Sequence, residues 1–465
     1  MCFKTTFSEY SNGFLGFKAQ YPGEEDTSDK NLKRKLQGIY YTPQYVVRYI
    51  VQQTLGRLLS EGRDVMSLRV LDPACGSGAF LIEAFDVLRR AYTTQYPEMP
   101  IAEVTHNILT KNLYGVDLDD QAVEVTRLNL SLRGAMTKGL LPTLVNIKHG
   151  NSLIADDDIA GEQLGFDWAI RFPDVIEAGG FDAVIGNPPY VRQETLGAQF
   201  KDYAKERYET YAGTADLYVY FIERGFSLLR DGGRMGYIVP NKWMRANYGK
   251  NIRVYLKDKI EELVDFGDLP VFAEATTYPC IIELSKDATD KQVTAATIKD
   301  LDFGDLGNHL QGNTYEVARD SLKKGGWALV SQAEQELLEK VKNNNISLKD
   351  FIENKIYLGI KTGLNTAFVI DEKLRRHLVE ADAKNADLIK PYLAGRDVKR
   401  YQVPSSGKYL ILIPNGWTTQ CIGQETNDDE AWAWFSDNYK ALADYLKQFE
   451  AKARKRGDKG EFWWE

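Results

Sequence analysis

Apolar side chains along the first part of the chain recur with a period that alternates between helical and strand-like. Residues 43–59 place them at helical spacing, and Thr42 and Pro43 fit the N-cap and the first helical position. Beyond this segment, short apolar runs of strand length alternate with amphipathic segments of helix length. The predicted strands are 67–71, 113–118, 144–148, 181–185 and 234–239, and the predicted helices are 78–92, 121–132 and 217–229. This alternation predicts an α/β fold with a doubly wound sheet and parallel strand pairing.

The alternation ends near residue 285, where short apolar runs begin to mix with turn signals. The residues before 38 are polar, contain glycine and end in a basic run. We therefore predict three parts, which are an N-terminal arm over 1–37, an α/β domain over 38–290 and a second domain over 291–465.

Charge is unevenly distributed along the chain. The 58 lysines and arginines are outnumbered by 66 aspartates and glutamates, which gives a net charge of −8. This sign by itself argues against a simple basic nucleic-acid binder. However, residues 156–182, which we call the acidic segment, contain eight acidic residues and one arginine. Nearly all of the excess negative charge therefore belongs to this segment, and the rest of the chain is close to neutral.

Cysteine and histidine residues are too scattered to form a recognisable metal or disulfide framework. The four cysteines form no CxxC pair, and the four histidines form no HxH or HExxH motif. No run approaches the ~18 consecutive apolar residues of a membrane span, and the N-terminus lacks a signal-peptide pattern. We therefore expect no metal cofactor, no membrane partner and a cytoplasmic location.

The first strand of the alternation continues through a glycine-rich turn, VLDPACGSGAFL over residues 70–81, into a helix. Gly76 and Gly78 allow the backbone to approach a ligand closely at the carboxyl end of the sheet. A dinucleotide-binding fingerprint would need a third glycine at the position of Leu81 and an acidic residue about 20 positions later. Asp72 lies inside the turn instead, where it suits an ammonium group better than a pyrophosphate. The turn therefore predicts a ligand other than a dinucleotide.

A later apolar strand, 181–185, leads into Gly186 and the sequence Asn-Pro-Pro-Tyr over 187–190. The two prolines remove two N–H donors and restrict Asn187 to an extended conformation. The side-chain oxygen of Asn187 and the carbonyl oxygen of Pro188 are then two fixed acceptors, which suit a planar amino group with two N–H donors. Accepting both hydrogens frees the delocalised lone pair of such a nitrogen, and Tyr190 can stack on the ring that carries it. This chemistry depends on positioning and electrostatics rather than on a general base.

The two motifs together resemble a known family. DPACGSGAF is similar to the cofactor loop of S-adenosylmethionine-dependent methyltransferases that methylate amino groups in DNA, and NPPY follows it 115 residues later, from Asp72 to Asn187. The motif order resembles the gamma class of N6-adenine DNA methyltransferases of restriction-modification systems, over about residues 36–286. The resemblance implies a Rossmann-like methyltransferase domain with a mixed sheet over 38–290, followed by an α+β target-recognition region over 291–465.

The resemblance also implies which residues bind the cofactor, S-adenosyl-L-methionine. Asp117, at the end of the second strand, takes the ribose hydroxyls, unless it caps the next helix together with Asp119 and Asp120. Asn151 occupies the adenine-contacting position, where aspartate is commoner. The full implied set is Tyr41, Thr42, Pro43, Asp72, Ala74, Gly76, Gly78, Asp117, Leu118, Asn151 and Ser152.

Chemistry on the target base is implied for a second set, which comprises Asn187, Pro188, Pro189, Tyr190 and Phe272. Asn187 favours N6 of adenine, because cytosine N4 enzymes more often carry serine there. A target base inside duplex DNA is unreachable and must be flipped out, which requires an aromatic clamp. Phe272, in the segment 270–278, is the candidate for the second aromatic, with Tyr278 as the weaker alternative and burial in the core as the non-catalytic reading of either ring.

Double-stranded DNA is the partner that the resemblance implies. Segments 357–370 and 389–401 resemble recognition-domain sequences, and residues 381–410 contain six basic and three acidic residues. A solvated surface would have a similar composition. We predict that the basic clusters 30–35, 390–400 and 452–459 flank the duplex and that the acidic segment faces away from it.

Two alternative functions remain open. One is methylation of a glutamine amide in a protein, because an amide also presents two N–H donors; the other is that of a catalytically silent DNA-binding subunit.

The chain ends in EFWWE over 461–465, which predicts uncovered apolar residues and a fragment with an incomplete recognition region. A restriction nuclease domain or subunit is an implied partner, but this chain carries no nuclease carboxylate constellation, so we expect it not to cleave DNA.

Overall fold

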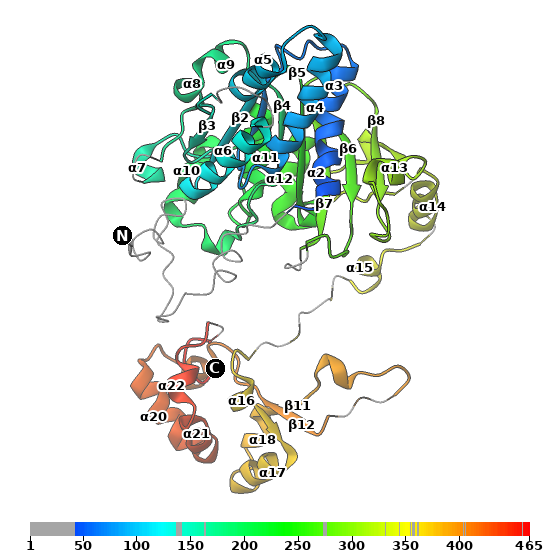
Figure 1. Cartoon of the computed structure of the whole chain (residues 1–465). Helices are drawn as coiled ribbons and strands as arrows, with labels where there is room; N and C mark the ends of the chain where they lie inside the picture. Colours follow the sequence, from blue (N-terminus) through cyan, green and yellow to red (C-terminus); the bar gives the residue numbers. More distant parts are fainter. Residues whose placement is uncertain are drawn as a thin grey trace. The chain divides into compact units, whose positions relative to one another are not determined.

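The computed structural model describes residues 42–465, except 136–141, 162–163, 273–276, 331, 344, 354, 356–358, 360–361, 403, 405 and 458. The chain separates into two compact units, Met1–Asn344 and Asn345–Glu465 (Figure 1). Among the described residues, no helix is both long enough and apolar enough to cross a membrane.

The first unit is built on one nine-stranded sheet with the order β3-β2-β1-β4-β5-β7-β6-β8-β9. Neighbours from β3 to β5 are parallel, and β7 lies antiparallel between β5 and β6. The strands are β1 Val70–Asp72, β2 Leu113–Asp117, β3 Ile147–His149, β4 Phe181–Gly186, β5 Leu229–Pro240, β6 Ile260–Asp265, β7 Pro279–Ser285, β8 Gln292–Thr297 and β9 Tyr315–Ala318. The predicted α/β fold with a mixed sheet is therefore confirmed.

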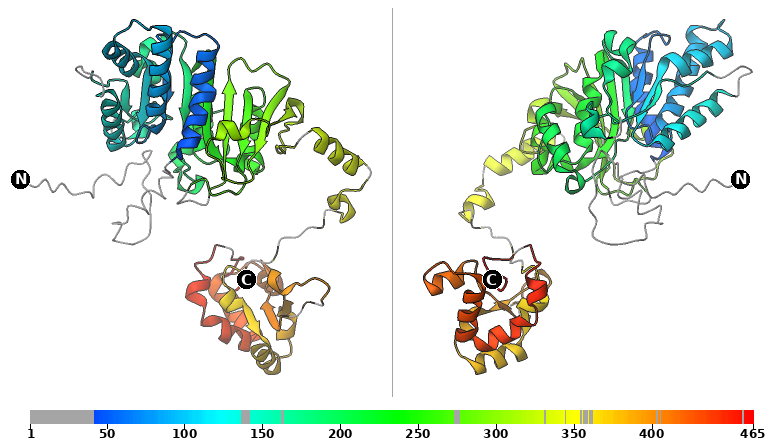
Figure 2. Two further views of the ribbon diagram at one scale, coloured as in Figure 1. Left: turned by 45° about the vertical axis from the view of Figure 1, so that its right-hand side comes forward. Right: turned by 90° about the vertical axis from the view of Figure 1, so that its left-hand side faces the viewer.

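Helices cover both faces of this sheet (Figure 2). Successive strand residues point to opposite faces: a Cβ on Gly236 of β5 would meet Ile50 and Thr54, whereas Tyr237 reaches Gly225. The main helices are α2 Gln44–Val51, which continues through a π-helical turn Gln52–Gly56 into α3 Arg57–Ser60, and α4 Ala79–Gln95, α5 Ile101–Asn107, α6 Asp120–Gly134, α10 Ala198–Arg207, α11 Tyr218–Ser227 and α12 Lys250–Leu256. Short helical turns are η4 Ile108–Asn112, η5 Gln193–Thr195, η6 Asn241–Met244, η7 Asn247–Gly249 and η8 Arg319–Ser321.

Each predicted strand and helix is present, with shifted ends. The largest shift is at β5, which begins at Leu229 rather than at residue 234. Its pairing with β4 changes register between Phe181 and Ala183, so the residues after Leu229 form an irregular, bulged start to the strand. The helix predicted over 217–229 consequently ends at Ser227.

The acidic segment folds into three short helices, α7 Asp157–Ala160, α8 Trp168–Arg171 and α9 Pro173–Glu177. Two of its acids are N-caps: Asp156 accepts a hydrogen bond from the amide of Asp158, and Asp167 accepts from Ala169 and Ile170. Carboxylates are favoured at helix N-termini by the unpaired amides and the helix dipole. Helix capping therefore accounts for two of the eight acidic residues in this segment.

The first domain extends beyond the predicted boundary at 290/291. β8 pairs in parallel with β6, and β9 pairs with β8, so both strands belong to the same sheet as the glycine-rich turn. Helices α13 Leu306–Leu310 and α14 Gln332–Asn343 follow within the same unit. The division falls instead at Asn344/Asn345, because the sheet adds two short strands, β8 and β9, after the helix–strand alternation has stopped.

The second unit has its own core around a three-stranded antiparallel sheet with the order β10-β12-β11. The strands are β10 Val369–Asp371, β11 Ile389–Tyr392 and β12 Lys408–Ile411. The helices are α15 Leu348–Phe351, α16 Asn365–Phe368, α17 Glu372–Ala381, α18 Asn385–Leu388, α19 Trp417–Ile422, α20 Asp428–Asn438, α21 Lys440–Lys447 and α22 Glu450–Ala453, with a 3-10 turn η9 at Gly395–Asp397. This unit is α+β, as expected for the C-terminal region.

The terminal aromatic residues lie inside this second core. Phe462 and Trp464 stack with ring centroids 4.8 Å apart, and Trp464 is fully buried with its indole N–H donating to Thr418. The Glu465 carboxylate accepts hydrogen bonds from the amides of Gly416 and Thr418. The prediction that these apolar residues are uncovered is therefore wrong, because they fill the space between α20 and the loop before α19.

Candidate cofactor and acceptor site

Polar residues end each of the first four strands, and the sheet brings those ends together. Asp72 and Asp117 are the last residues of β1 and β2, Asn151 follows β3 by two positions, and Asn187 directly follows β4. Because β1 to β4 are parallel, their carboxyl ends meet at one edge of the sheet. The residues that the sequence singled out on these strands are thus neighbours at this edge.

The glycine-rich turn is fastened to the end of β2. The two carboxylate oxygens of Asp117 accept hydrogen bonds from the amides of Gly76 (2.8 Å) and Asp119 (2.9 Å). Gly78, with φ of 83°, starts α4, and Gly76 has no atom within 4 Å of where a Cβ would lie. The N-cap of α6 is Asp119, which accepts from Gln121. Asp117 therefore holds the turn rather than capping the helix, and the turn leaves open space beside Gly76.

Asp72 is buried beneath this turn. Its Oδ1 accepts a hydrogen bond from the amide of Ala74 at 3.1 Å, and the residue is 1% exposed. A Cβ at Gly186, the last residue of β4, would lie 2.8 Å from the same oxygen, so the two strand ends approach closely only because this position is glycine. Burial, together with the charge of Asp117, raises the pKa of Asp72 to about 8. A cation bound here would favour the charged form of this carboxyl group.

The residues after β3 are also buried. Asn151 accepts a hydrogen bond from the amide of Leu153 at 3.1 Å, while its Nδ2 is buried with no acceptor among the described residues. Ser152 donates to the carbonyl oxygen of Pro73 at 2.6 Å, so its hydroxyl ties this loop to the glycine-rich turn. The carbonyl oxygen of Leu118 lies 2.9 Å from Nε2 of His149. Asn151 thus keeps an unused donor, whereas Ser152 and Leu118 have internal partners.

Asn187 is held in one orientation by the segment before α2. Its Nδ2 donates to Oγ1 of Thr42 over 3.0 Å, and its Oδ1 is buried with no donor among the described residues. The expected N-cap role of Thr42 is wrong: Pro43 occupies the N-cap position, α2 begins at Gln44, and no side chain caps it. The Thr42 hydroxyl instead accepts a hydrogen bond from Asn187, 145 residues away in the sequence. The amide nitrogen of Asn187 is thereby paired, and its side-chain oxygen remains without a donor among the described residues.

The two aromatic candidates are in contact. The Tyr190 hydroxyl donates to the carbonyl oxygen of Ile238 in β5 at 3.1 Å, and its ring centroid lies 6.0 Å from that of Phe272 at an interplanar angle of 76°. Phe272 is 3% exposed, whereas Tyr278, the weaker alternative, is 46% exposed. Pro188 is buried and Pro189 half-buried between them and the strand end. The fold therefore places Phe272, rather than Tyr278, beside Tyr190.

Several predicted residues lie outside the described part of the chain. These are Tyr41, the basic cluster 30–35, residues 273–276 of the segment 270–278, and residues 357, 358, 360 and 361 of the segment 357–370.

The sequence analysis did not single out two polar residues at strand ends. Asn241 directly follows β5 and Asp265 is the last residue of β6, and Nδ2 of Asn241 donates to Oδ1 of Asp265 at 2.8 Å. The available signal was positional: each follows an apolar strand at the same end as Asp72 and Asn187, but neither belongs to a recognised motif.

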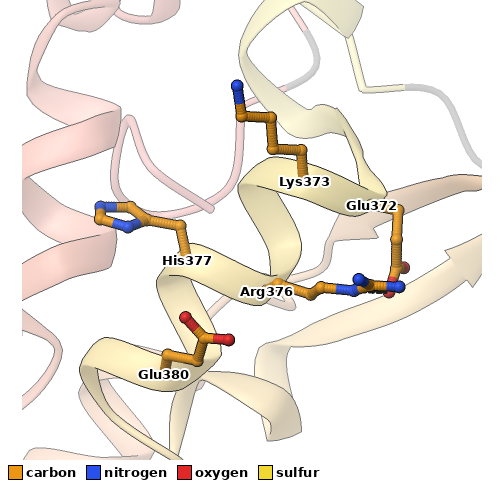
Figure 3. Close-up of a pocket in the computed structure, with 5 residues that line it drawn as sticks. All are labelled: Glu372, Lys373, Arg376, His377 and Glu380. Carbon is orange, nitrogen blue, oxygen red and sulfur yellow. Dashed lines mark hydrogen bonds and ion pairs between the residues drawn. The ribbon is translucent and has the colours of Figure 1, made fainter.

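A hollow in the second unit is a less suitable site. It is lined by one face of α17, with Glu372, Lys373, Arg376, His377 and Glu380 (Figure 3). Nε of Arg376 donates to Glu372 at 2.8 Å, so the opposite charges on this face largely compensate one another. No residue predicted for cofactor or base lines it.

Parts of the first unit are similar to known methyltransferase families. Residues 111–272 match the family described as Eco57I restriction-modification methylase, and residues 60–139 match the RMKL-like methyltransferase domain. The chain is 28% identical over 365 residues to the type II restriction enzyme and methyltransferase RM.Eco57I of Escherichia coli, covering 71% of this chain and 36% of that protein. It is 23% identical over 486 residues to the adenine-specific methyltransferase PglX of Streptomyces coelicolor, covering 91% and 39%.

The fold has a counterpart among solved structures. The DrdV–DNA complex superposes with a TM-score of 0.54 at 15% identity, covering 77% of this chain and 39% of that one. The chain spans 36% to 66% of the length of the first curated relatives that it matches. The match to the Eco57I restriction-modification methylase family covers residues 111–272, and the chain is similar to curated relatives that include the adenine-specific methyltransferase PglX.

Proposed function

We propose that this chain transfers a methyl group from S-adenosylmethionine to the exocyclic N6 of an adenine flipped out of duplex DNA. The observation that carries the proposal is the open Oδ1 of Asn187, a buried acceptor fixed at the end of β4. The naming of PglX as adenine-specific supports adenine as the base. Methylation of a protein amide is the less favoured alternative, because the curated relatives are methyltransferases of restriction-modification systems.

The acceptor chemistry follows from the atoms at the strand end. An aminopurine nitrogen is a poor nucleophile because its lone pair is delocalised into the ring. Asn187 Oδ1 and the carbonyl oxygen of Pro188 each accept one of its two N–H groups, which favours a pyramidal nitrogen with an available lone pair. Because Thr42 already accepts from Nδ2 of Asn187, the side-chain oxygen of Asn187 needs no reorientation to act as an acceptor.

The ends of β1, β2 and β3 fit S-adenosylmethionine, which supplies an electrophilic methyl group when bound. Asp72 would hold the positively charged amino end, since its buried carboxylate has no cationic partner among its described contacts. Asp117 would accept the ribose hydroxyls, because each carboxylate oxygen accepts more than the one amide it now has. The unused Nδ2 of Asn151 would donate a hydrogen bond to the adenine ring. The open space beside Gly76 would let the ligand lie close to the backbone of the glycine-rich turn.

Tyr190 and Phe272 would clamp the extruded base. A base in a duplex cannot reach the buried Asn187, and aromatic rings compensate part of the stacking lost on extrusion. Tyr190 follows the two prolines directly, so its ring lies on the same strand end as the acceptor oxygens. Phe272 packs edge-on against it at 6.0 Å.

The second unit would contribute to reading the DNA. Between β11 and β12 it carries Arg396, Lys399 and Arg400, all exposed, followed by Tyr401, which is 92% exposed. Exposed cations suit phosphate contacts, and an exposed aromatic suits a base. A restriction nuclease domain or subunit is a further proposed partner, because RM.Eco57I combines both activities and extends beyond this chain.

The test offers labelled S-adenosylmethionine together with a pool of duplex DNA and, in parallel, a bacterial protein extract. We expect the label in DNA, and sequencing of the DNA for N6-methyladenine then gives the recognition sequence. Asn187→Ala protein is the matched control and should incorporate no label. Incorporation into protein alone would contradict the proposal.

A further inference from the structure

The ends of β5 and β6 carry a polar pair with no part in the reaction proposed above. Asn241 follows β5 and Asp265 ends β6, and β7 lies antiparallel between the two strands, so β5 and β6 run in the same direction. Their carboxyl ends therefore meet at the same edge as Asn187. Asp265 is 7% exposed, and its Oδ1 accepts a hydrogen bond from Nδ2 of Asn241 at 2.8 Å.

This pair holds both ends of the segment that carries Phe272. At the near end, Oδ1 of Asp265 also accepts from the amide of Gly267 at 3.0 Å, and Nδ2 of Asn241 lies 3.4 Å from the Gly267 carbonyl oxygen. At the far end, the backbone amide of Asn241 donates to the carbonyl oxygen of Tyr278 at 2.7 Å. The side chain of Asn241 thus contacts the segment at Gly267, five residues before Phe272, while its backbone extends the pairing of β5 with β7 at Tyr278.

The same strand also fixes the other aromatic ring. Tyr190 is bonded through its hydroxyl to Ile238, three positions before Asn241. β5 therefore determines the place of Tyr190 directly and that of Phe272 through Asn241. The two rings meet edge-on at an interplanar angle of 76°. A planar base stacks between two rings only when their faces are nearly parallel, so this arrangement does not accommodate one. Phe272 must turn against a fixed Tyr190 to admit one, and its anchorage decides where it turns.

We propose that Asn241, held by Asp265, is a positioning residue that sets Phe272 relative to Tyr190 and thereby stabilises the extruded base over the open oxygen of Asn187. The proposal rests on the proposed DNA adenine methylation. It adds a residue pair outside the recognised motifs, which acts through Phe272 and touches neither the cofactor nor the reacting nitrogen.

The first test compares single-turnover methylation by variants of the chain on a duplex with the recognition sequence found by sequencing. Asn241→Ala should slow methylation about 30-fold and diminish the fluorescence rise of 2-aminopurine at the target position. The affinity for S-adenosylmethionine should change less than about twofold, because the cofactor contacts are on other strands. Asp265→Ala should resemble Asn241→Ala, whereas Asp265→Asn keeps an acceptor oxygen and should stay within about threefold of wild type. Asn308→Ala, exposed on α13, is the matched control.

The second test separates positioning from general destabilisation. If Asn241 acts through Phe272, then Asn241→Ala should add less than about twofold to the defect of Phe272→Ala. A full 30-fold effect in that background, or wild-type rates for Asn241→Ala and Asp265→Ala, would overturn the inference. If Asn241→Ala fails to fold, the pair Asp265→Ala and Asp265→Asn decides. Absence of methylation by the wild-type chain would instead refute the proposed function, and this inference with it.

Discussion

The carboxyl ends of β1, β2 and β3 form the proposed cofactor half of the site, and those of β4, β5 and β6 form the proposed acceptor half. The hydrogen bonds of the two halves differ. At the cofactor half, three polar side chains accept bonds within their own loops: Ala74 donates to Asp72, Asp119 to Asp117 and Leu153 to Asn151, each from two residues away. Asp117 and Ser152 also bond the glycine-rich turn across the sheet. At the acceptor half, the bonds join distant parts of the chain, as between Thr42 and Asn187. Local bonds therefore set part of the cofactor half, whereas the orientation of the Asn187 side chain depends on long-range folding.

The largest expected effect comes from removing the unpaired side-chain oxygen of Asn187, which should impair the acceptor half and leave the cofactor half intact. Asn187→Ala should lower methyl transfer on the order of 10³-fold, because it removes a buried acceptor that acts on the reacting nitrogen. The affinity for S-adenosylmethionine should stay within severalfold, since the bonds of the cofactor half remain. Single-turnover rates and calorimetric titration measure the two quantities. Near-normal transfer would refute the assigned role of Asn187.

The second-largest expected effect comes from a residue that contacts both halves. Gly186 ends the acceptor strand, but a Cβ there would lie 2.8 Å from Oδ1 of Asp72 in the cofactor half. Gly186→Ala should therefore weaken cofactor affinity and slow transfer, the latter by about 100-fold, because small displacements of aligned groups are costly. Gly213→Ala is a matched control, since the nearest atom to its Cβ is 3.8 Å away. If Gly186→Ala left cofactor affinity intact, the halves would be more independent than the structure indicates.

The orientation of Asn187 gives a smaller effect. Thr42→Val removes the oxygen that accepts from Nδ2 of Asn187 and leaves that donor without its partner. We expect about a 30-fold loss of transfer, equivalent to a missing hydrogen bond in a buried site. Thr42→Ser keeps the hydroxyl and should retain most activity. Equal losses in both variants would show that packing rather than the hydrogen bond matters at this position.

The smallest effect concerns the pH dependence of the cofactor half. The pKa of Asp72 is raised to about 8, so the folded protein holds a proton that the unfolded chain releases near its ordinary pKa of 3.8. The contribution of Asp72 to stability therefore decreases as the pH rises from about 4 to 8, and is constant above that.

Binding a cation beside Asp72 must then expel this proton. Between pH 6 and pH 7, the affinity for S-adenosylmethionine should rise nearly tenfold, at most about tenfold per pH unit below the pKa of the free carboxyl group. Calorimetry in buffers of different ionisation enthalpy should show release of about one proton per site at these pH values. Asp72→Asn should bind more weakly and lose the pH dependence. A wild-type affinity that is constant over this range would contradict the cationic contact.

The sequence located the strand ends and the turn of the proposed cofactor half, because periodicity and turn chemistry are local signals. Strand periodicity located β1 to β4, and the turn chemistry of Gly76 and Gly78 marked the ligand edge. The acceptor half was predicted only in part. The NPPY motif identified Asn187 and Tyr190, but Thr42 was given a capping role, and the Asn241–Asp265 pair carried no motif at all.

The second half of the chain shows the same limit on a larger scale. β8 and β9 are short strands at one end of the sheet, and no local pattern shows that they join a sheet begun more than 200 residues earlier. The terminal aromatics look uncovered in the sequence, but Trp464 packs against Phe435 and Phe462 in the core of the second unit. Both predictions failed because burial is decided by partners that are distant in the sequence.

By itself, the sequence determined where β1 to β4 end, which polar side chains stand at those four ends and which family the motifs resemble. Those features depend on hydrophobic period and turn geometry over a few residues. Only the tertiary structure decided which atoms remain open for chemistry. The oxygen of Asn187 is an open acceptor because Thr42, 145 residues away, takes its amide N–H, and Phe272 stands beside Tyr190 because Asn241 and Asp265 hold its segment. Hydrogen bonds between distant residues form only once the sheet has aligned the strand ends, and they turn a set of motifs into a reactive site.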